Sequence, residues 1–368
     1  MNESWIRRIW DHKDPLGWLL WFFVLPLSWF YFLLVVIRDG IYSLGWMPLR
    51  SLPCAVVSVG NLTVGGTGKT PTTLWLAGEL SRRGHKVAIL SRGYKRTGKG
   101  IRILGPEFSE AESTEENRRS SDVGDEPTMM AAIYGQKAGV GRKRYEAGEQ
   151  LLREFEVDVF LLDDGFQHRQ LRRDIDLLLL GSDWSGWMMP AGPFREPRKA
   201  LRRANLYLIT GARERWEFLL SPYPKESVFF GALQANGLFT LEGNQWKKHP
   251  LSLLDRRKIL TVSAISSPSS FYGMIREWEG EIVDTLEFPD HHSYSAQDWQ
   301  RINRAARHAE MIVTTEKDIV KLIHFPFPRE KLLALRVEMV VENGSSLVQA
   351  VENVVKTKKA GPLRFQER

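Results

Sequence analysis

Residues 55–70 read AVVSVGNLTVGGTGKT, and this stretch indicates the fold. The run Ala55–Val59 is uncharged and mostly β-branched, which is typical of a short buried strand. A glycine-rich segment follows and ends in Lys69-Thr70. Apolar residues at helical spacing come next, from Leu74 to Leu80, and Gly84 ends them. A strand, a glycine-rich loop and a helix in this order predict a phosphate-binding loop, or P-loop.

The predicted P-loop matches G-x-x-x-x-G-K-[ST], except that Thr63 replaces the first glycine. Backbone N–H groups of such a loop approach phosphates closely, and the helix start adds a favourable dipole. We expect Lys69 to neutralise the β- and γ-phosphates and the Thr70 hydroxyl to ligate Mg²⁺. This predicts a nucleoside triphosphate site, against the alternative of a plain glycine-rich turn. The residues expected to bind the nucleotide are Thr63, Val64, Gly65, Gly66, Thr67, Gly68, Lys69 and Thr70.

A second acidic motif fits the same chemistry. The buried-strand pattern Val157–Leu162 runs directly into Asp163-Asp164-Gly165. Beside a P-loop, one of these carboxylates is expected to hold Mg²⁺ directly or through water, and Asp163 has the usual position. The alternative for Asp-Asp-Gly is a hairpin turn. The chain has no Asn-Lys-x-Asp sequence for guanine, so ATP is favoured over GTP.

Strand and helix patterns alternate along the rest of the chain. They predict an α/β fold: a P-loop NTPase-like, mostly parallel sheet with helices on both faces, plus a smaller C-terminal α/β domain. Two strand patterns around residues 227–246, with Asn236-Gly237 and Gly243-Asn244 as turn signals, predict a two-stranded linker. The expected parts are an N-terminal membrane anchor at 1–38, a P-loop domain at 39–226, the linker at 227–256 and a second domain with a basic tail at 257–368.

The segment Pro15–Ile37 predicts the anchor, because it carries no formal charge over 23 residues. A helix of that length reaches about 34 Å, enough for a hydrocarbon core of about 30 Å. It is too long for the apolar part of a secretory signal, and its spread of Trp and Tyr argues against a buried core helix. Pro26 is expected to kink or split it. Basic residues at both ends favour a monotopic anchor over a single tilted span.

The overall charge is +7, from 51 Lys and Arg against 44 Asp and Glu, and it favours anionic partners. Basic residues cluster at Arg169–Arg173 and Arg195–Arg203. These clusters are either solvated faces or, with the anchor, a surface that faces anionic lipid headgroups. A single cysteine, Cys54, excludes a disulfide framework and a Cys-built metal site.

Two further positions are candidate catalytic residues. Asp125, in Gly124-Asp125-Glu126-Pro127, is placed either as a helix N-cap or as a general base for an attacking hydroxyl. Downstream, the Pro-containing loop Phe288–His292 carries His291 and His292. Histidine titrates near neutrality and loops often carry chemistry, although adjacent histidines can also occur on a surface by chance.

Taken together, these motifs resemble the tetraacyldisaccharide 4'-kinase family, which phosphorylates lipid A precursors. The matching stretches are Gly60–Pro71 (GNLTVGGTGKTP), Ser91–Tyr94 (SRGY), Val123–Pro127 (VGDEP), Asp163–His168 (DDGFQH), Pro190–Pro197 (PAGPFREP), Phe288–His292 (FPDHH) and Thr315–Asp318 (TEKD). They occur in the family's order, and Thr63 in the P-loop is usual for the family. Val262–Pro268 (VSAISSP) departs from the glycine-rich turn that the family more often has there.

The resemblance implies transfer of the γ-phosphate of ATP to the 4'-hydroxyl of an acylated glucosamine disaccharide 1-phosphate. It implies Mg²⁺, and a place at the cytoplasmic face of the inner membrane. The family's Asp–His pair falls on Asp125 and His291, with His292 less favoured, and its acidic metal pair on Asp163 and Asp164. No role follows for the TEKD residues Glu316, Lys317 and Asp318. With the boundaries above, Asp125 and His291 would meet only across an interdomain cleft that closes on substrate.

Two other functions remain as alternatives at this point. The first is a membrane-anchored P-loop NTPase that drives a protein partner, with no small-molecule acceptor. The second is a nucleic-acid-dependent ATPase, which only the basic charge suggests. Base-stacking aromatics do not alternate with the basic clusters, so we expect no nucleic-acid partner.

Overall fold

The computed structural model describes residues 9–10, 14–94, 96, 98–105, 123–242, 245–266 and 268–360. These residues form two compact units. Unit 1 takes the described parts of Met1–Leu90, Arg144–Ala232 and Val340–Arg368, and unit 2 takes those of Ser91–Lys143 and Leu233–Met339. The chain passes from unit 1 to unit 2 inside strand β8 (Val228–Glu242), and it returns to unit 1 inside strand β13 (Leu332–Val341).

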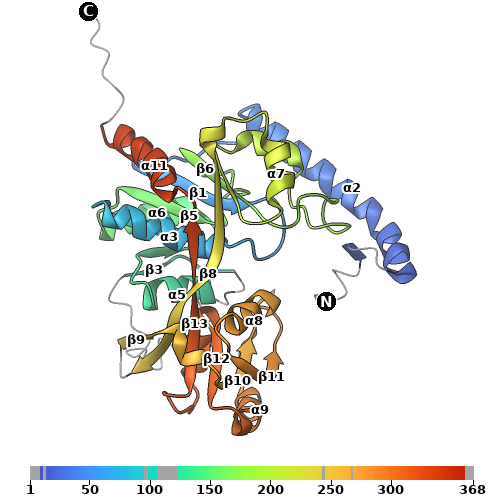
Figure 1. Cartoon of the computed structure of the whole chain (residues 1–368). Helices are drawn as coiled ribbons and strands as arrows, with labels where there is room; N and C mark the ends of the chain where they lie inside the picture. Colours follow the sequence, from blue (N-terminus) through green and yellow to red (C-terminus); the bar gives the residue numbers. More distant parts are fainter. Residues whose placement is uncertain are drawn as a thin grey trace, which may run out of the picture. The chain divides into compact units, whose positions relative to one another are not determined.

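Unit 1 is built on parallel strands in the order β8-β7-β6-β1-β5-β2. Figure 1 labels β8, β6, β1 and β5 among them. The strands besides β8 are β1 (Ala55–Asn61), β2 (Val87–Ser91), β5 (Val159–Asp163), β6 (Ile175–Leu180) and β7 (Leu206–Ile209). β1 is central and buried along its whole length, which agrees with its uncharged sequence. In the register, Val57 lies beside Leu161 of β5 and Ile175 of β6.

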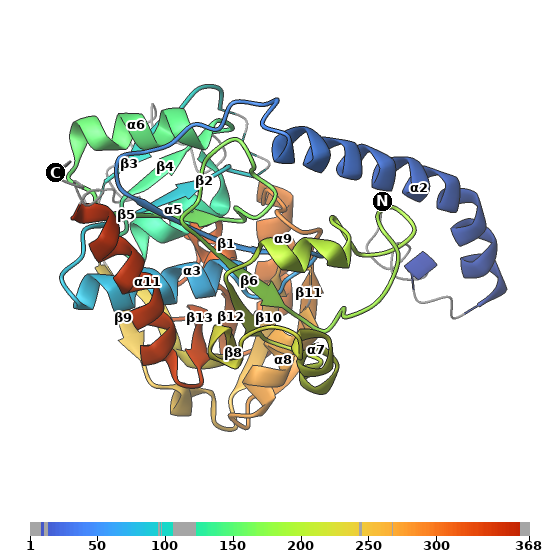
Figure 2. The same cartoon turned by 90° about the horizontal axis from the view of Figure 1, so that it is seen from above.

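Helices cover both faces of this sheet. α3 (Lys69–Arg82) and α11 (Gly344–Lys359) pack on β1, and Figure 2 shows α6 (Arg144–Glu154) on the opposite face. The remaining short elements of unit 1 are η3 (Arg198–Arg203), α7 (Arg213–Leu220) and η4 (Lys225–Ser227). The predicted α/β fold, with a mostly parallel sheet between helices, is confirmed.

Unit 2 has its own parallel strands, in the order β11-β10-β12-β13. Its elements are β3 (Arg102–Leu104), α5 (Asp125–Ala132), β4 (Ala138–Val140), β9 (Gln245–His249), η5 (Leu251–Leu254), β10 (Lys258–Ser263), α8 (Pro268–Arg276), β11 (Glu281–Glu287), α9 (Ala296–Ala305), η6 (Ala306–His308), β12 (Met311–Thr315) and α10 (Glu316–Leu322). α5 packs against α10, although almost 200 residues separate them in the chain. The described residues of 91–143, a range expected within the P-loop domain, therefore belong to unit 2.

The expected turn at Asn236-Gly237 is wrong, because β8 runs through both residues without a break. β8 pairs antiparallel with β9, from Leu238 opposite His249 to Glu242 opposite Gln245. A Cβ atom on Gly237 would lie 3.2 Å from the His249 carbonyl oxygen, a tight contact, so glycine here permits close approach of the neighbouring strand. The second turn signal, Gly243-Asn244, lies outside the described residues.

The N-terminal apolar segment forms α2 (Pro15–Ser43), one helix long and apolar enough to cross a membrane by length and composition. Asp14 caps it by accepting a hydrogen bond from the Gly17 N–H at 2.8 Å. Only 11% of its most apolar window is buried, and large side chains such as Phe22 and Phe23 are exposed. The helix continues through Pro26, so the expected split does not occur.

Candidate active site

The P-loop of unit 1 joins β1 to α3. Gly68 stands at the N-cap of α3 with a left-handed φ of 83°, a conformation that favours glycine. At the end of β1, a Cβ on Gly60 would lie 2.6 Å from Phe166 Cβ, so only glycine fits there. Lys69 begins the helix, and its Nζ donates to the Gly65 carbonyl at 3.4 Å. Glycines thus shape the loop that presents the lysine.

The two carboxylates after β5 have different partners. Asp163 accepts from the Thr70 hydroxyl at 3.1 Å and from the Thr73 hydroxyl at 3.3 Å. Asp164 instead accepts a hydrogen bond from each terminal nitrogen of the Arg195 guanidinium, both at 3.0 Å. Its Oδ1 also lies 3.7 Å from Lys69 Nζ. Asp163 therefore has hydroxyl partners, and Asp164 has cationic ones.

The charge around Asp164 is strongly positive. Burial alone would raise the pKa of Asp164, but Lys69 and then Arg195 outweigh burial and lower that pKa to about 2. Arg195 also donates from Nε to the Thr63 carbonyl at 3.1 Å, so one guanidinium joins Asp164 to the start of the P-loop. Asp164 is thus a fixed anion between two cations.

The chemistry of this donor set fits Mg²⁺. The Thr70 hydroxyl and the Asp163 carboxylate are hard oxygen donors side by side, and Mg²⁺ in nucleotide sites takes few protein ligands besides phosphate oxygens and water. Among the described residues, no group of three or more His, Cys, Asp or Glu could hold a metal ion alone. Asp163 suits the ion better than Asp164, whose oxygens are already bound to Arg195.

Asp125 and His291 come together inside unit 2. Asp125 is the first residue of α5, and its Oδ2 lies 3.3 Å from His291 Nδ1. The expectation that this pair forms only across an interdomain cleft differs from the structure, since both residues belong to one compact unit. Asp125 is not the N-cap, because that position is taken by Gly124. His291 has a left-handed φ of 61°, a strained conformation of the kind found at functional sites.

Two lysines of α10 complete this cluster. Lys321 Nζ donates to Asp125 Oδ2 at 2.9 Å, and Lys317 Nζ lies 2.9 Å from His291 Nε2. An ammonium group only donates, so Nε2 accepts, and neutral His291 carries its proton on Nδ1, beside Asp125. Lys317 also contacts Glu126 at 3.3 Å and Asp290 at 3.4 Å. Burial would lower the pKa of Lys317, but these two acids raise it.

The same contacts keep Asp125 ionised. Burial works to raise the pKa of Asp125, while the hydrogen bond with His291 and the charge of Lys321 outweigh burial and lower that pKa. His292 has another role: its Nε2 lies 3.1 Å from Asp298, and its ring stacks on Phe288. Of the two histidines, only His291 contacts Asp125.

The TEKD residues divide into structural and site positions. Glu316 is buried and binds Arg336 at 2.8 Å and the Tyr134 hydroxyl at 3.0 Å. Asp318 accepts from the Ala264 N–H at 2.9 Å, which fixes the start of the VSAISSP segment. Lys317 faces His291, and Lys321 lies four residues further on, one helical turn away. Sequence reasoning gave Lys317 no role and missed Lys321, although their spacing on one helix face was a usable signal.

Several arginines expected to face lipid headgroups form ion pairs within unit 1 instead. The pairs are Arg169 with Asp39, Arg173 with Asp176, Arg195 with Asp164, and Arg203 with Glu196. Arg172, Arg198, Lys199 and Arg202 are exposed. The basic clusters thus mix internal partners of acidic residues with solvent-exposed charges.

Comparisons with known proteins agree on one family. The family model described as tetraacyldisaccharide-1-P 4'-kinase matches residues 20–356. A tetraacyldisaccharide 4'-kinase of Syntrophus aciditrophicus is 36% identical over 384 residues, covering 95% of this chain and 98% of that protein. One from Aquifex aeolicus is 32% identical, covering 90% and 98%. A crystal structure of Aquifex aeolicus LpxK in complex with ATP has a TM-score of 0.75 and 30% identity, covering 91% and 99%.

Proposed function

This chain belongs to the tetraacyldisaccharide-1-P 4'-kinase family, and we propose that two groups of residues carry out the family's reaction in it. The protein is an ATP-dependent lipid A 4'-kinase, which transfers the γ-phosphate of ATP to the 4'-hydroxyl of a tetraacyldisaccharide 1-phosphate. The first group lies around Lys69 in unit 1. The second lies around Asp125 in unit 2.

The Lys69 group binds the nucleotide. Phosphoryl transfer depends on held phosphates and neutralised charge more than on covalent chemistry. Residues Thr63–Thr70 wrap the phosphates with backbone N–H groups, and Lys69 supplies positive charge at the β- and γ-phosphates. Thr70 and Asp163 would hold Mg²⁺, which neutralises phosphate charge when bound. Asp164 holds Lys69 and Arg195 in place.

The Asp125 group prepares the acceptor. The observation that carries this assignment is a largely buried, ionised carboxylate whose Oδ2 contacts both His291 and Lys321. Such a carboxylate accepts the proton of a sugar hydroxyl as the oxygen attacks. His291 orients Asp125 through Nδ1, and Lys317 fixes His291 through Nε2. The chain thus has a base, an orienting group and a support for that group.

Transfer of label tests the assignment of both groups. Purified enzyme is given ATP labelled in its γ-phosphate and a tetraacyldisaccharide 1-phosphate in mixed micelles, and label in the lipid is measured. We expect Asp125→Ala to lose about 10²–10⁴-fold in transfer while it still binds ATP. Lys69→Ala should lose ATP binding itself. Normal transfer by Asp125→Ala would exclude it as the base, and label found only in inorganic phosphate would favour an NTPase that drives a partner.

The exposed apolar residues of α2 support membrane attachment. Phe22, Phe23 and Phe30 are each at least 60% exposed, which is costly in water. The other side of α2 is hydrogen bonded to the loop before η3. These bonds begin at Trp21, which donates to the Ala191 carbonyl, and end at Arg38, which donates to Glu196. This covers about 26 Å of helix, so a spanning position would bury that loop in lipid. A monotopic anchor at the cytoplasmic face of the inner membrane, where ATP is available, fits both observations.

A further inference from the structure

One side of α2 is hydrogen bonded to the loop that leads from β6 to η3. The Ser28 hydroxyl, 1% exposed, donates to the Met188 carbonyl at 2.7 Å. The Tyr31 hydroxyl donates to the Arg195 carbonyl at 3.0 Å, and the Trp21 indole to the Ala191 carbonyl at 3.1 Å. Ser28, Tyr31 and Arg38 follow one another at intervals of three and seven residues, so they share one helix face. This face is built from polar groups with specific partners, unlike the apolar remainder of the helix.

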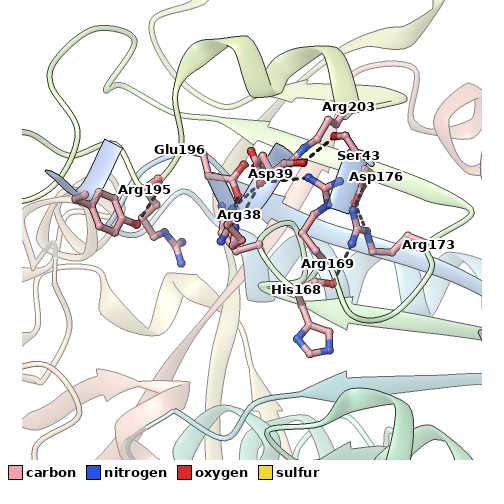
Figure 3. A network of polar contacts seen from close by, with 12 residues as sticks. Arg38, Asp39, Ser43, His168, Arg169, Arg173, Asp176, Arg195, Glu196 and Arg203 are labelled. Atoms are coloured by element: carbon pink, nitrogen blue, oxygen red, sulfur yellow. Dashed lines mark hydrogen bonds and ion pairs between the residues drawn. The ribbon is translucent and has the colours of Figure 1, made fainter. Parts of the chain in front are cut away.

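The C-terminal end of α2 joins a buried ion-pair network (Figure 3). Glu196 is fully buried, and its carboxylate binds Arg38 of α2 at 2.7 Å and Arg203 of η3. The neighbouring Asp39 contacts Arg169 at 3.2 Å and Arg203 at 3.5 Å. The buried Glu196 charge needs its cations, because an unpaired carboxylate in the interior is strongly unfavourable. The conformation of the loop at Glu196 therefore depends on where α2 places Arg38.

Arg195 immediately precedes Glu196 and enters the nucleotide site. Its guanidinium holds Asp164 by two bonds of 3.0 Å and the Thr63 carbonyl at 3.1 Å. Its own carbonyl is held by Tyr31, and the next side chain by Arg38. The backbone that aims this guanidinium is thus fixed from α2 on both sides of the residue.

We propose that Glu196, Arg38 and Tyr31 are positioning residues for the ATP site, and that α2 is a working part of that site as well as an anchor. The proposal rests on the proposed role of the Lys69 group. Displacement of α2 would release Glu196 and Tyr31, turn Arg195 away from Asp164, and loosen the start of the P-loop. The expected consequence is weaker use of ATP, with the use of lipid unchanged.

Steady-state kinetics of the full chain test this proposal. Arg38→Gln and Glu196→Gln are compared with Arg202→Gln, an exposed arginine of the same 3-10 helix as Arg203. We expect kcat/KM for ATP to fall on the order of ten- to a hundredfold in the first two, with KM for the lipid within about twofold of wild type. The double variant should be no worse than the worse single variant, because both remove one interaction. Arg202→Gln should behave as wild type.

Two more variants separate positioning from folding and anchoring. Tyr31→Phe removes one hydroxyl and no charge, so it folds normally, and we expect a smaller loss confined to kcat/KM for ATP. Phe22→Ser, on the exposed side of α2, should weaken binding to vesicles and leave kcat/KM for ATP unchanged. Wild-type ATP kinetics in Tyr31→Phe and Glu196→Gln would overturn the proposal. Absence of lipid phosphorylation by the wild-type enzyme would instead contradict the proposed function.

Discussion

Asp125 shows how a largely buried carboxylate can stay ionised. Burial favours the neutral acid, but Lys321 and His291 reverse that preference. The sequence could indicate Asp125 and His291 through the family resemblance, because both lie in short motifs. It could not indicate Lys321 as the partner of Asp125, because their contact joins residues 196 positions apart. Local sequence patterns carry no information on contacts between residues so far apart in the chain.

Removal of Lys321 should change the pH profile. In the wild type the pKa of Asp125 is lowered, so activity that needs the carboxylate persists until the pH falls below the ordinary carboxyl range. In Lys321→Met burial is less opposed, and the acid limb of kcat/KM should move up by about one to three pH units. The measurement is log kcat/KM against pH at saturating ATP. An acid limb that stays in place would contradict Asp125 as the titrating base.

Asp163 and Asp164 should differ in their metal dependence. Asp163 shares a hydrogen bond with Thr70, whereas Asp164 is bound to Arg195. We expect Asp163→Asn to raise the Mg²⁺ concentration needed for half-maximal transfer by roughly ten- to a hundredfold, since a carboxylate ligand is lost. Asp164→Asn should lower kcat with little change in that concentration. A Mg²⁺ titration of both variants checks this, and equal shifts would refute the division of roles.

At the scale of elements, α10 connects the Asp125 group to the core of unit 2. Thr315 caps the helix by accepting from the Asp318 N–H, and Asp318 in turn holds the Ala264 N–H. Lys317 and Lys321 extend from this helix to His291 and Asp125. The short helix is fixed by buried polar contacts, so its two lysines are placed with little freedom.

Glu316 should matter for stability more than for chemistry. Its carboxylate is 7% exposed and binds Arg336, whose guanidinium lies 3.5 Å from the Phe239 ring centroid. Glu316→Gln keeps the shape but leaves a buried arginine without its anion, and we expect a loss of about 1–3 kcal/mol in the free energy of unfolding. Glu330→Gln, at an exposed position, is the control. Thermal denaturation measures both, and an unchanged melting temperature for Glu316→Gln would contradict this role.

The elements also show what sequence patterns can and cannot define. Periodicity predicted β1, α3 and β5 because each has an unbroken apolar pattern. Asn236-Gly237 was misleading, because a turn dipeptide only permits a turn. In β8 the pairing with β9 outweighs that local preference, and glycine permits the close approach of the His249 backbone instead.

At the scale of the whole molecule, membrane binding should depend on α2 and only weakly on charge. Many basic side chains are occupied by internal acids, while Phe22 and Phe23 are exposed. We expect a Phe22→Ser, Phe23→Ser variant to lose most of its flotation with vesicles made of neutral lipid plus anionic lipid. Wild-type flotation should persist in ~1 M salt, where charge attraction is screened. Loss of wild-type flotation in salt would show that the basic surface dominates instead.

The division into units was beyond the reach of sequence reasoning. The chain leaves unit 1 after Leu90, returns at Arg144, leaves again in β8 and returns in β13. Alternation of strands and helices identifies the fold class but does not tell which segments pack together. For that reason the sequence pattern places 91–143 with the P-loop domain, whereas the described residues of this range belong to unit 2, and it does not predict that Asp125 lies beside His291 inside one unit.

The return of the chain to unit 1 at Val340, before α11, affects how the protein is synthesised. α11 packs on β1 and α3. Its Glu352 forms an ion pair at 2.9 Å with Arg83, which follows the last residue of α3. A ribosome that has just finished α10 has already produced every residue of the Lys69 and Asp125 groups, yet α11, one of the two helices that pack on β1, has not been synthesised. Domains often fold while the chain is still emerging, but here the part of the nucleotide-binding sheet under α11 stays uncovered until that helix is made. Nascent chains arrested before residue 344 therefore expose apolar strand surface, and chaperones that bind such surface are expected to hold this enzyme until α11 is released.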